Sequence, residues 1–526
     1  MPVPLPVPFP RLVLGPDARR MTHWPMHDTA GNRALESLGN STLSDPGDHG
    51  LMQRAGASVA RLARAVAPHA RQVWILAGPG NNGGDGFEAA LTLSRAGLKA
   101  QIGWIGSEER LPADARHALQ RARQAGVSIE PHCRIPERLS RDDLVIDALL
   151  GRGLNRSPDG QLAHAITTLR QSPAPILAVD IPSGLRADSG TLTESGLCVQ
   201  ARWTLALLGL APGLFTVHGR DVSGEIWWDD LGIDVQRIAP TAWLASTSVL
   251  LGQWPARRHV QHKGSFGDVW VVGGAAGMGG AIRLAGKAAL RGGAGRVRLV
   301  RLAPESDPVA SPELMTASLP ELLDNPSPLH RATVVAGCGG GPDITRVLPM
   351  LCEVAPRLIL DADALNALAR EHALRDVLRA RHAHALSTIL TPHPLEAARL
   401  LDDPVEEVQS HRLESAARLA RELGCVVALK GSGTVVASPD QLPMMHAVGN
   451  VALAAPGSGD VLAGYLGGLW SQLALSSAAL SSPDTARQAA HTAVHWHGLR
   501  AEAICPAGQV LGAAELADAL DLPGMP

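Results

Sequence analysis

Apolar and polar positions follow a repeating order of short apolar run, Gly-rich stretch and amphipathic segment. Apolar residues recur at helical spacing over Leu51–Ala67, and Val73–Ala77 is a continuous apolar run. The stretch Gly78–Gly86 then predicts a turn, and Phe87–Arg95 predicts a helix. Continuous apolar runs are typical of strands buried on both faces of a parallel sheet. We therefore expect a strand, a turn and a helix in this order.

The same order restarts after an irregular stretch, Ile233–Pro255, which predicts a connection between domains. The restart is a strand over Val269–Val272, a turn over Gly273–Gly280 and a helix over Ala281–Arg291. Strands that alternate with helices indicate parallel sheets covered by helices on both faces. We predict two α/β domains, over residues 21–240 and 250–526. Further predicted strands are Leu144–Leu149, Ile176–Asp180, Thr204–Leu208, Val297–Leu302, Thr333–Ala336, Leu358–Leu360 and Val426–Leu429.

Composition and charge narrow the functional classes. Hydrophobic residues make up 45% of the 526 residues and charged residues 18%, which is typical of globular domains with a large core. The formal net charge of −3 provides no global field that would attract nucleic acid or an anionic membrane. No apolar run reaches the roughly 18 residues of a membrane span. We therefore expect neither nucleic acid nor a membrane as a partner.

The cysteines and the first residues of the chain indicate the cellular compartment of the protein. The 6 cysteines are scattered and form no CxxC pair, which argues against a zinc site and a disulfide framework and favours a reducing cytoplasm. Residues 1–20 lack the basic and apolar regions of a signal peptide. We predict a disordered leader there, with Met21 as an alternative start.

Polar side chains follow several predicted strands of the first domain. The stretch Gly78–Gly86 is dense in Gly, Asn and Asp, which favours a ligand-binding loop over a plain connection. Asp147 and Asp180 each end a predicted strand, where parallel sheets place their ligands. Carboxylate, amide and hydroxyl oxygens without His or Cys suit a hard cation. The alternative for each Asp is to cap the following helix.

Three motifs of this domain resemble the NAD(P)HX epimerase family. They are GPGNNGGDG from Gly78, DALLGRG from Asp147 and VDIPSG from Val179, and the similarity covers about residues 21–235. The resemblance implies a Rossmann-like three-layer α/β/α domain that inverts the hydroxyl-bearing C6 of the hydrated nicotinamide ring. It implies that K⁺ is held by Asn82, Asp147 and Ser183. The substrate-binding residues that it implies are Asn81, Asn82, Gly83, Gly84, Asp85, Gly151, Arg152, Gly153, Leu154, Asn155, Arg156, Ser157 and Asp180.

We predict that Asp180 is the catalytic proton-transfer group of this domain. It sits where a base is needed, and no Lys or Arg is adjacent to it in the sequence. Two positions depart from the family. Gln53 replaces a usual Glu, and Ala211 replaces a Lys that usually precedes Pro-Gly. The loss of that ammonium group puts the rate of epimerisation in doubt more than the fold.

Three segments of the second domain point to phosphate chemistry. Pro456–Gly464 is a Gly-rich turn that runs into an apolar helix, whose first N–H groups can stabilise charge on a phosphate, and Asp460 lies there as a base or as a simple helix cap. Lys430, one of only four lysines, ends a predicted strand and suits a nucleotide phosphate. His393 lies in a turn bracketed by prolines, which favours function over a buried structural role.

These segments resemble the ribokinase-like superfamily and, more narrowly, the ADP/ATP-dependent NAD(P)HX dehydratases. The narrower motifs include LTPHPLEAARL, LKGSGT and GNVALAAPGSGDVLAG, and the similarity covers about residues 255–520. Gly337–Gly341 reads GCGGG where the family usually reads GPGLG. The resemblance implies a ribokinase-like α/β domain with substrate-binding residues Ala281, Gly339, Gly341, His393 and Asp460. The nucleotide-binding residues that it implies are Lys430, Gly431, Ser432, Gly433, Thr434 and Gly459.

The chain is thus predicted to be a bifunctional enzyme that repairs NADHX and NADPHX. A ring hydroxyl leaves poorly, and its phosphorylation from ADP or ATP, with Mg²⁺ and with Asp460 as the catalytic group, converts water loss into phosphate loss. By analogy we favour ADP, and a homo-oligomer stays open. One alternative is a ribokinase-like kinase of a vitamin alcohol with an accessory domain. Another is that the first domain only binds a ligand, since Gln53 and Ala211 depart from the family.

Overall fold

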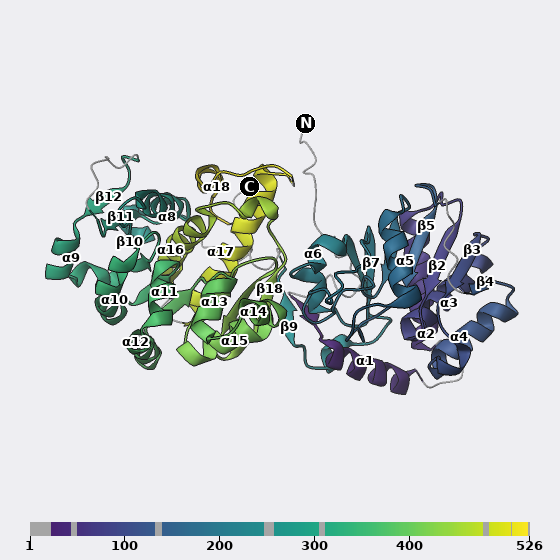
Figure 1. The fold of residues 1–526 in the computed structure, drawn as a ribbon. Helices are drawn as coiled ribbons and strands as arrows, with labels where there is room; N and C mark the ends of the chain where they lie inside the picture. Colours follow the sequence, from purple (N-terminus) through teal and green to yellow (C-terminus); the bar gives the residue numbers. More distant parts are fainter. Residues whose placement is uncertain are drawn as a thin grey trace. The chain divides into compact units, whose positions relative to one another are not determined.

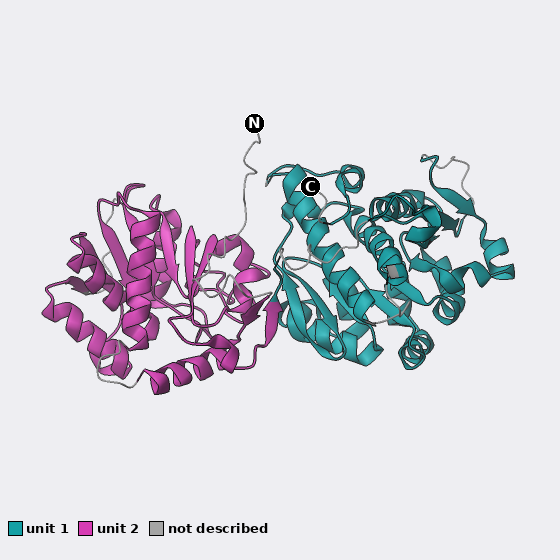
Figure 2. Ribbon diagram, turned by 180° about the vertical axis from the view of Figure 1, so that it is seen from behind, with its two compact units in different colours: residues 1–8, 244–526 teal, residues 9–243 magenta. Residues whose placement is uncertain are grey.

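The computed structural model describes residues 23–43, 50–131, 139–246, 257–303, 311–476, 483–506 and 508–523. They fall into two compact units, one ending at Trp243 and one starting at Leu244, which Figure 2 colours separately. The predicted leader over residues 1–20 lies outside the described residues. The predicted connection Ile233–Pro255 is described only as far as Ser246, and there it contains a short strand, β9 (Ala242–Leu244).

The first unit is built on a sheet of 7 strands, all parallel, in the order β4-β3-β2-β5-β6-β7-β8 (Figure 1). The predicted strands at Val73, Leu144, Ile176 and Thr204 are confirmed, but β3, β4 and β8 were not predicted. The bounds are β2 (Val73–Ala77), β3 (Ala100–Trp104), β4 (Ser128–Pro131), β5 (Leu144–Ala148), β6 (Ile176–Val179), β7 (Trp203–Leu207) and β8 (Glu225–Asp229).

Helices cover both faces of this sheet. Successive strand residues point to opposite faces. Leu76 and Val145 pack in one buried cluster with α5 (Gly160–Gln171), whereas Ile75 faces α3 (Asn81–Arg95). The helices α2 (Leu51–Val66) and α4 (Ala113–Gln124) pack against α3, and α1 (Thr29–Thr42) precedes them in the chain. The predicted three-layer α/β/α fold is confirmed.

The predicted turn over Gly78–Gly86 is wrong in its second half, because α3 begins at Asn81. The glycines at the start of α3 allow this helix to pack closely against neighbouring elements. A Cβ at Gly83 would lie 2.2 Å from the carbonyl oxygen of Gly78, and one at Gly84 would lie 2.6 Å from the sulfur of Met52. The glycines therefore let the first turns of α3 lie directly against β2 and α2.

In the second unit the strands lie in the order β18-β17-β16-β15-β14-β13-β10-β11-β12 (Figure 1). They are parallel except for β17 and β18, which are added as antiparallel strands at one side. All predicted strands of this unit are confirmed. The bounds are β10 (Asp268–Gly273), β11 (Arg296–Arg301), β12 (Met315–Ala317), β13 (Thr333–Ala336), β14 (Arg357–Leu360), β15 (Ser387–Leu390), β16 (Val426–Leu429), β17 (Thr434–Ser438) and β18 (Gln441–His446).

One row of aligned apolar residues crosses this sheet. Val271, Val335, Ile359 and Ile389 pair in register on neighbouring strands and are fully buried. They pack in one cluster with α8 (Gly279–Arg291), α16 (Ser458–Ser476) and α17 (Pro483–Ile504). On the other face, α12 (His372–Ala383) and α15 (Arg412–Leu423) contact β15 and β16 (Figure 1).

The remaining helices of this unit are shorter: α9 (Leu319–Asp324), α10 (Leu348–Val354), α11 (Asp363–Arg370), α13 (Pro394–Leu401), α14 (Val405–Ser410) and α18 (Ala513–Ala519). Among the described residues, no helix combines the length and the apolar character that crossing a membrane requires.

Candidate active sites

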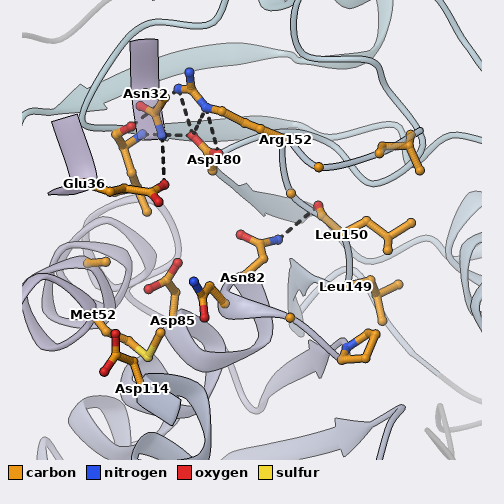
Figure 3. Close-up of a pocket in the computed structure, with 18 of the residues that line it drawn as sticks. Asn32, Glu36, Met52, Asn82, Asp85, Asp114, Leu149, Leu150, Arg152 and Asp180 are labelled. Carbon is orange, nitrogen blue, oxygen red and sulfur yellow. Dashed lines mark hydrogen bonds and ion pairs between the residues drawn. The ribbon is translucent and has the colours of Figure 1, made fainter. Parts of the chain in front are cut away.

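A cavity of about 630 Å³ opens at the carboxyl ends of the strands in the first unit. The start of α3, the loop after β5 and Asp180 after β6 form its wall on the sheet side (Figure 3). Residues of α1 and α2 complete it. The cavity therefore lies where parallel sheets place their ligands.

The predicted cation ligands Asn82, Asp147 and Ser183 come together around the backbone of Leu150. Asn82 Nδ2 donates to the carbonyl oxygen of Leu150 at 3.1 Å, and Ser183 Oγ lies 3.3 Å from the same oxygen. Ser183 Oγ also donates to Asp147 Oδ1 at 2.6 Å. Amide, carboxylate, hydroxyl and carbonyl oxygens are thus available at one point of the fold.

Asp147 is fully buried at the end of β5. Its carboxylate accepts from the backbone N–H groups of Ser183 at 2.8 Å and Leu149 at 3.2 Å. Burial nevertheless raises its pKa to about 6, against the opposing effect of these hydrogen bonds. A buried carboxylate among oxygen ligands with a raised pKa fits a hard cation, because a positive charge would stabilise its ionised form.

Asp180 is held in a strained conformation directly beneath the cavity. Its φ is 63°, which is rare for a residue other than glycine and is often found at functional sites. Arg152 Nε lies 3.0 Å from Asp180 Oδ2, and Arg152 Nη2 lies 3.1 Å from Asp180 Oδ1 (Figure 3). Asp180 thus has a cationic partner in space, although no Lys or Arg is adjacent to it in the sequence. The partner was missed because it is 28 residues away in sequence.

Arg152 is itself buried and fully engaged. Besides Asp180, its guanidinium donates to the carbonyl oxygens of His27 at 3.2 Å and Leu207 at 3.4 Å, and also to that of Gly209. It lines the cavity, as predicted for a substrate-binding residue, but its donors serve Asp180 and the backbone.

Four more carboxyl residues line this cavity, namely Glu36, Asp85, Asp114 and Asp159, and the charge of Asp180 acts on the first two. Glu36 comes from α1 and Asp85 from α3 (Figure 3). Burial raises the pKa of Glu36, and the nearby Asp180 raises it further. The pKa of Asp85 is raised well above its usual range, first by burial and then by Asp180, Glu36 and Glu88. Glu36 was not predicted, since no motif marks it.

The other predicted residues of this site divide into two groups. Asn81 and the whole segment Gly151–Ser157 line the cavity, whereas Gly83 and Gly84 are buried within α3. Gln53 lines the cavity, and Ala211 is fully buried outside its lining.

The second unit gathers charged groups where β14, β15 and β16 end. Lys430 Nζ lies 2.6 Å from Asp361 Oδ1, and Thr391 Oγ1 donates to the same oxygen at 2.8 Å. A Cβ at Gly459 would lie 3.2 Å from the Lys430 ammonium, so this group reaches the first turn of α16. Lys430 is thus paired with Asp361, which lies in the dehydratase-like motif LDADALN but had no predicted role.

Asp460 joins this group from α16. One oxygen of Asp460, one of Asp361 and the sulfur of Cys338 all lie within 4.8 Å of one another. Burial and the charge of Asp361 raise the pKa of Asp460 to about 6, while a hydrogen bond from the Cys338 thiol and the charge of Lys430 lower it. Asp460 is therefore a carboxyl group that can take up a proton near neutral pH.

The other predicted substrate-binding residues surround this group. A Cβ at Gly339 would lie 3.0 Å from the Cβ of Ala281, which places the two side by side. Gly341 N–H donates to Asp363 Oδ2 at 2.8 Å. His393 caps α13, and its Nε2 lies 3.3 Å from the buried Glu396. Burial raises the pKa of Glu396 to about 7.

Hydrogen bonds from Arg412 hold the predicted nucleotide-binding turn Lys430–Thr434 in place. This buried guanidinium donates to the carbonyl oxygens of Leu429, Lys430 and Gly433, at 3.1 to 3.2 Å. Gly431 has a φ of 129°, a conformation open to glycine. The turn is thus fixed in shape and leaves Ser432 exposed.

Comparisons with known proteins match two separate parts of the chain to two family models. A family model of the YjeF-related protein N-terminus matches residues 48–213, and a model of the NAD(P)H-hydrate dehydratases matches residues 269–520. The bifunctional NAD(P)H-hydrate repair enzyme Nnr of Escherichia coli is 38% identical over 437 residues, which cover 80% of each chain. The same enzyme of Coxiella burnetii is 35% identical over 462 residues, covering 85% of this chain and 90% of that one.

Among solved structures, an ADP/ATP-dependent NAD(P)H-hydrate dehydratase from Bacillus subtilis, crystallised with ATP and Mg²⁺, is 27% identical with a TM-score of 0.41. It covers 52% of this chain and 95% of its own. The sequence matches confirm the resemblance that the motifs indicated.

Proposed function

The chain belongs to the family of bifunctional NAD(P)H-hydrate repair enzymes. We propose which reaction each of its two units catalyses. The first unit interconverts the R and S epimers of NADHX and NADPHX. The second unit dehydrates the S epimer at the expense of ADP or ATP. The observation that carries this proposal is the position of Asp460 in the first turn of α16, next to Asp361 and Lys430.

In the second unit, Asp460 takes the proton of the C6 hydroxyl while the oxygen of that hydroxyl attacks the terminal phosphorus of the nucleotide. The first N–H groups of α16 stabilise the charge of the transferring phosphoryl group. The C6–O bond then breaks, with the ring nitrogen donating its electron pair and phosphate leaving. Loss of a proton from C5 restores NADH or NADPH. Mg²⁺ bound with the nucleotide neutralises part of its charge.

The turn Lys430–Thr434 and Gly459 hold the nucleotide, and Ala281, Gly339, Gly341 and His393 hold the hydrated dinucleotide. The pairing of Lys430 with Asp361 favours an orienting role for this ammonium group at the edge of the phosphate site. We favour ADP as the donor, by analogy with bacterial relatives.

In the first unit, the loop Gly151–Ser157 and the start of α3 bind the substrate above Asp180. The Arg152 guanidinium holds the Asp180 carboxylate in position, and this carboxylate can stabilise positive charge on the ring or receive a proton from it. The oxygens of Asn82, Asp147 and Ser183 would hold K⁺, whose charge would stabilise the carboxylate of Asp147 beside the loop after β5.

The test mixes the full chain with both epimers of NADHX, Mg²⁺, and ADP or ATP in turn, and follows the near-ultraviolet absorbance of NADH. We expect complete recovery of NADH with release of inorganic phosphate. The Asp460→Asn variant should lose at least about 100-fold in the rate of recovery. An unchanged rate in this variant would contradict the proposal, and a stable phosphorylated product would indicate a small-molecule kinase instead. Omitting K⁺ should slow only the use of the R epimer.

A further inference from the structure

We propose that Asp85 is the acid of the epimerase site. Its protonated carboxyl group gives a proton to the C6 hydroxyl as the C6–O bond breaks, and its carboxylate is protonated again from solvent after water has added to the opposite face of the ring and released a proton to solvent. This inference rests on the epimerase activity proposed above for the first unit, and it names a second catalytic residue for that activity.

The carboxyl groups around the cavity differ in whether a cationic side chain is bound to them. The carboxyl groups of Glu36, Asp85 and Asp180 face it from α1, from α3 and from the end of β6 (Figure 3). The other charged or titratable side chains in its lining, besides Arg152, are Arg33, Asp114, His117, Arg121, Arg156 and Asp159. Arg152 serves Asp180 and uses its remaining donors on backbone carbonyls. Asp180 is therefore paired with a buried cation, and it is less suited than an unpaired carboxyl group to act as the acid.

Asp85 has the opposite surroundings. No hydrogen bond or ion pair within the described residues involves its side chain, and it is only half-buried, so part of it is open to the cavity. Burial and the neighbouring Asp180, Glu36 and Glu88 raise its pKa well above the usual range. A carboxyl group without a cationic partner, next to one that is paired with a cation, is the pattern of an acid and its charged partner.

Glu36 is less suited to this role. Its Oε1 already accepts a hydrogen bond from Asn32 Nδ2 at 3.1 Å, and Asn32 is in turn fixed by the N–H of Gly209 at 3.0 Å. This chain of contacts holds the Glu36 carboxyl toward α1. Glu36 therefore acts on Asp85 chiefly through its charge.

The chemistry at C6 needs both kinds of group. The hydroxyl and the ring nitrogen share the same carbon, so the nitrogen can expel the oxygen as water once it has been protonated. The step breaks the C6–O bond, forms a C=N⁺ bond and turns the Asp85 acid into a carboxylate. The Asp180 carboxylate stabilises the positive ring. Water then adds from the other face and releases one proton to solvent, and the Asp85 carboxylate takes up one proton from solvent, which restores the enzyme.

The experiment uses the full chain with Asp85→Asn, and Asp142→Asn as the matched control, because Asp142 is exposed in the turn before β5. Purified R epimer is supplied, and the S epimer formed is separated by chromatography. We expect kcat for epimerisation to fall about 10²- to 10⁴-fold in Asp85→Asn, with KM changed much less, and to stay unchanged in the control. A larger KM with unchanged kcat would overturn the proposal, since it would indicate binding only.

Two further measurements distinguish a catalytic role of Asp85 from a merely structural one. The wild-type rate should fall as the pH rises through the pKa of the acid, and Asp85→Glu should keep this limb at a shifted pH. In water labelled with ¹⁸O, each inversion should place one labelled oxygen on C6. Inversion with retention of the original oxygen, or an Asp85→Glu variant without the basic limb, would overturn the proposal.

The outcomes separate this inference from the proposed function. If the wild-type chain does not interconvert the epimers at all, the proposed function of the first unit fails. If it does so and Asp85→Asn keeps the wild-type rate, only the role of Asp85 fails.

Discussion

Arg152 and Asp180 form an ion pair whose side chains are 6% and 13% exposed. Such a pair is costly to break, because the remaining charge stays buried without a partner. The backbone around it is strained as well, since Asp180 has a positive φ. The pair is therefore both a functional group and a structural one, and the two roles can be measured separately.

Replacing Arg152 by Met should destabilise the first unit by about 3–5 kcal/mol, because Asp180 loses the partner of its buried charge. Urea unfolding of the full chain, followed by a signal from the first unit, measures this free energy. Adding Asp180→Asn to the Met variant should recover part of the loss. Equal stability of the wild type and the Met variant would show that water or another group satisfies Asp180.

The thiol of Cys338 should tune Asp460 in the second unit. Asp460 must be ionised to accept a proton, so the dehydration rate should rise as the pH rises through its pKa of about 6. The hydrogen bond from Cys338 lowers this pKa. In Cys338→Ala the pKa should therefore move up, and the acid limb of the rate profile should move to higher pH.

The measurement is the initial rate of NADH formation from the S epimer across that pH range. Cys352→Ala is the matched control, because Cys352 is equally buried but lies on α10. Its profile should coincide with that of the wild type. A Cys338→Ala profile that moves to lower pH, or not at all, would contradict a tuning role.

At the scale of elements, the start of α3 depends on glycines that no side chain can replace. The Cβ of an alanine at Gly83 would lie 2.2 Å from the carbonyl oxygen of Gly78, the residue directly after β2. Gly83→Ala should destabilise the first unit by about 1–3 kcal/mol through overpacking, although alanine is the better helix former.

Gly153→Ala is the control for this change, because a Cβ there meets nothing within 4 Å. Thermal unfolding should show the loss for Gly83→Ala and little change for Gly153→Ala. A stable Gly83→Ala variant would mean that α3 can shift away from β2.

The sequence predicted best those elements whose residues are apolar on both faces. Val73–Ala77, Thr333–Ala336 and Val426–Leu429 match their strands residue by residue. The strands β4 and β8 were missed because they are edge strands with polar residues such as Glu130 and Glu225, which weaken the apolar run. The turn at Gly78 was extended too far, because glycine inside a helix signals packing that only the neighbouring elements reveal.

Site residues could be predicted where they end a strand, but their partners could not. Asp147, Asp180 and Lys430 were found from their position after apolar runs. The pairs Arg152–Asp180 and Lys430–Asp361 join residues 28 and 69 positions apart. No local pattern encodes such pairs, because they follow from which strands become neighbours in the sheet.

At the scale of the whole molecule, the chain carries two sites in two compact units. Each unit holds its own acid groups at the carboxyl ends of its own sheet. The product of the first reaction, the S epimer, is the substrate of the second. The two reactions should therefore also proceed when the active units are supplied on different chains.

Complementation tests this expectation. Asp180→Asn should lose epimerisation and keep dehydration, whereas Asp460→Asn should do the reverse. Given the R epimer, Mg²⁺ and ADP or ATP, Asp180→Asn alone should form NADH only at the rate of spontaneous epimerisation, and Asp460→Asn alone only at its residual rate of dehydration. An equimolar mixture should restore rapid and complete recovery, because the S epimer released by one chain diffuses to the other. A mixture no faster than Asp180→Asn alone would show either that the S epimer is passed on without release or that Asp460→Asn has also lost the first activity. The rate of R-to-S conversion by Asp460→Asn alone decides between these two.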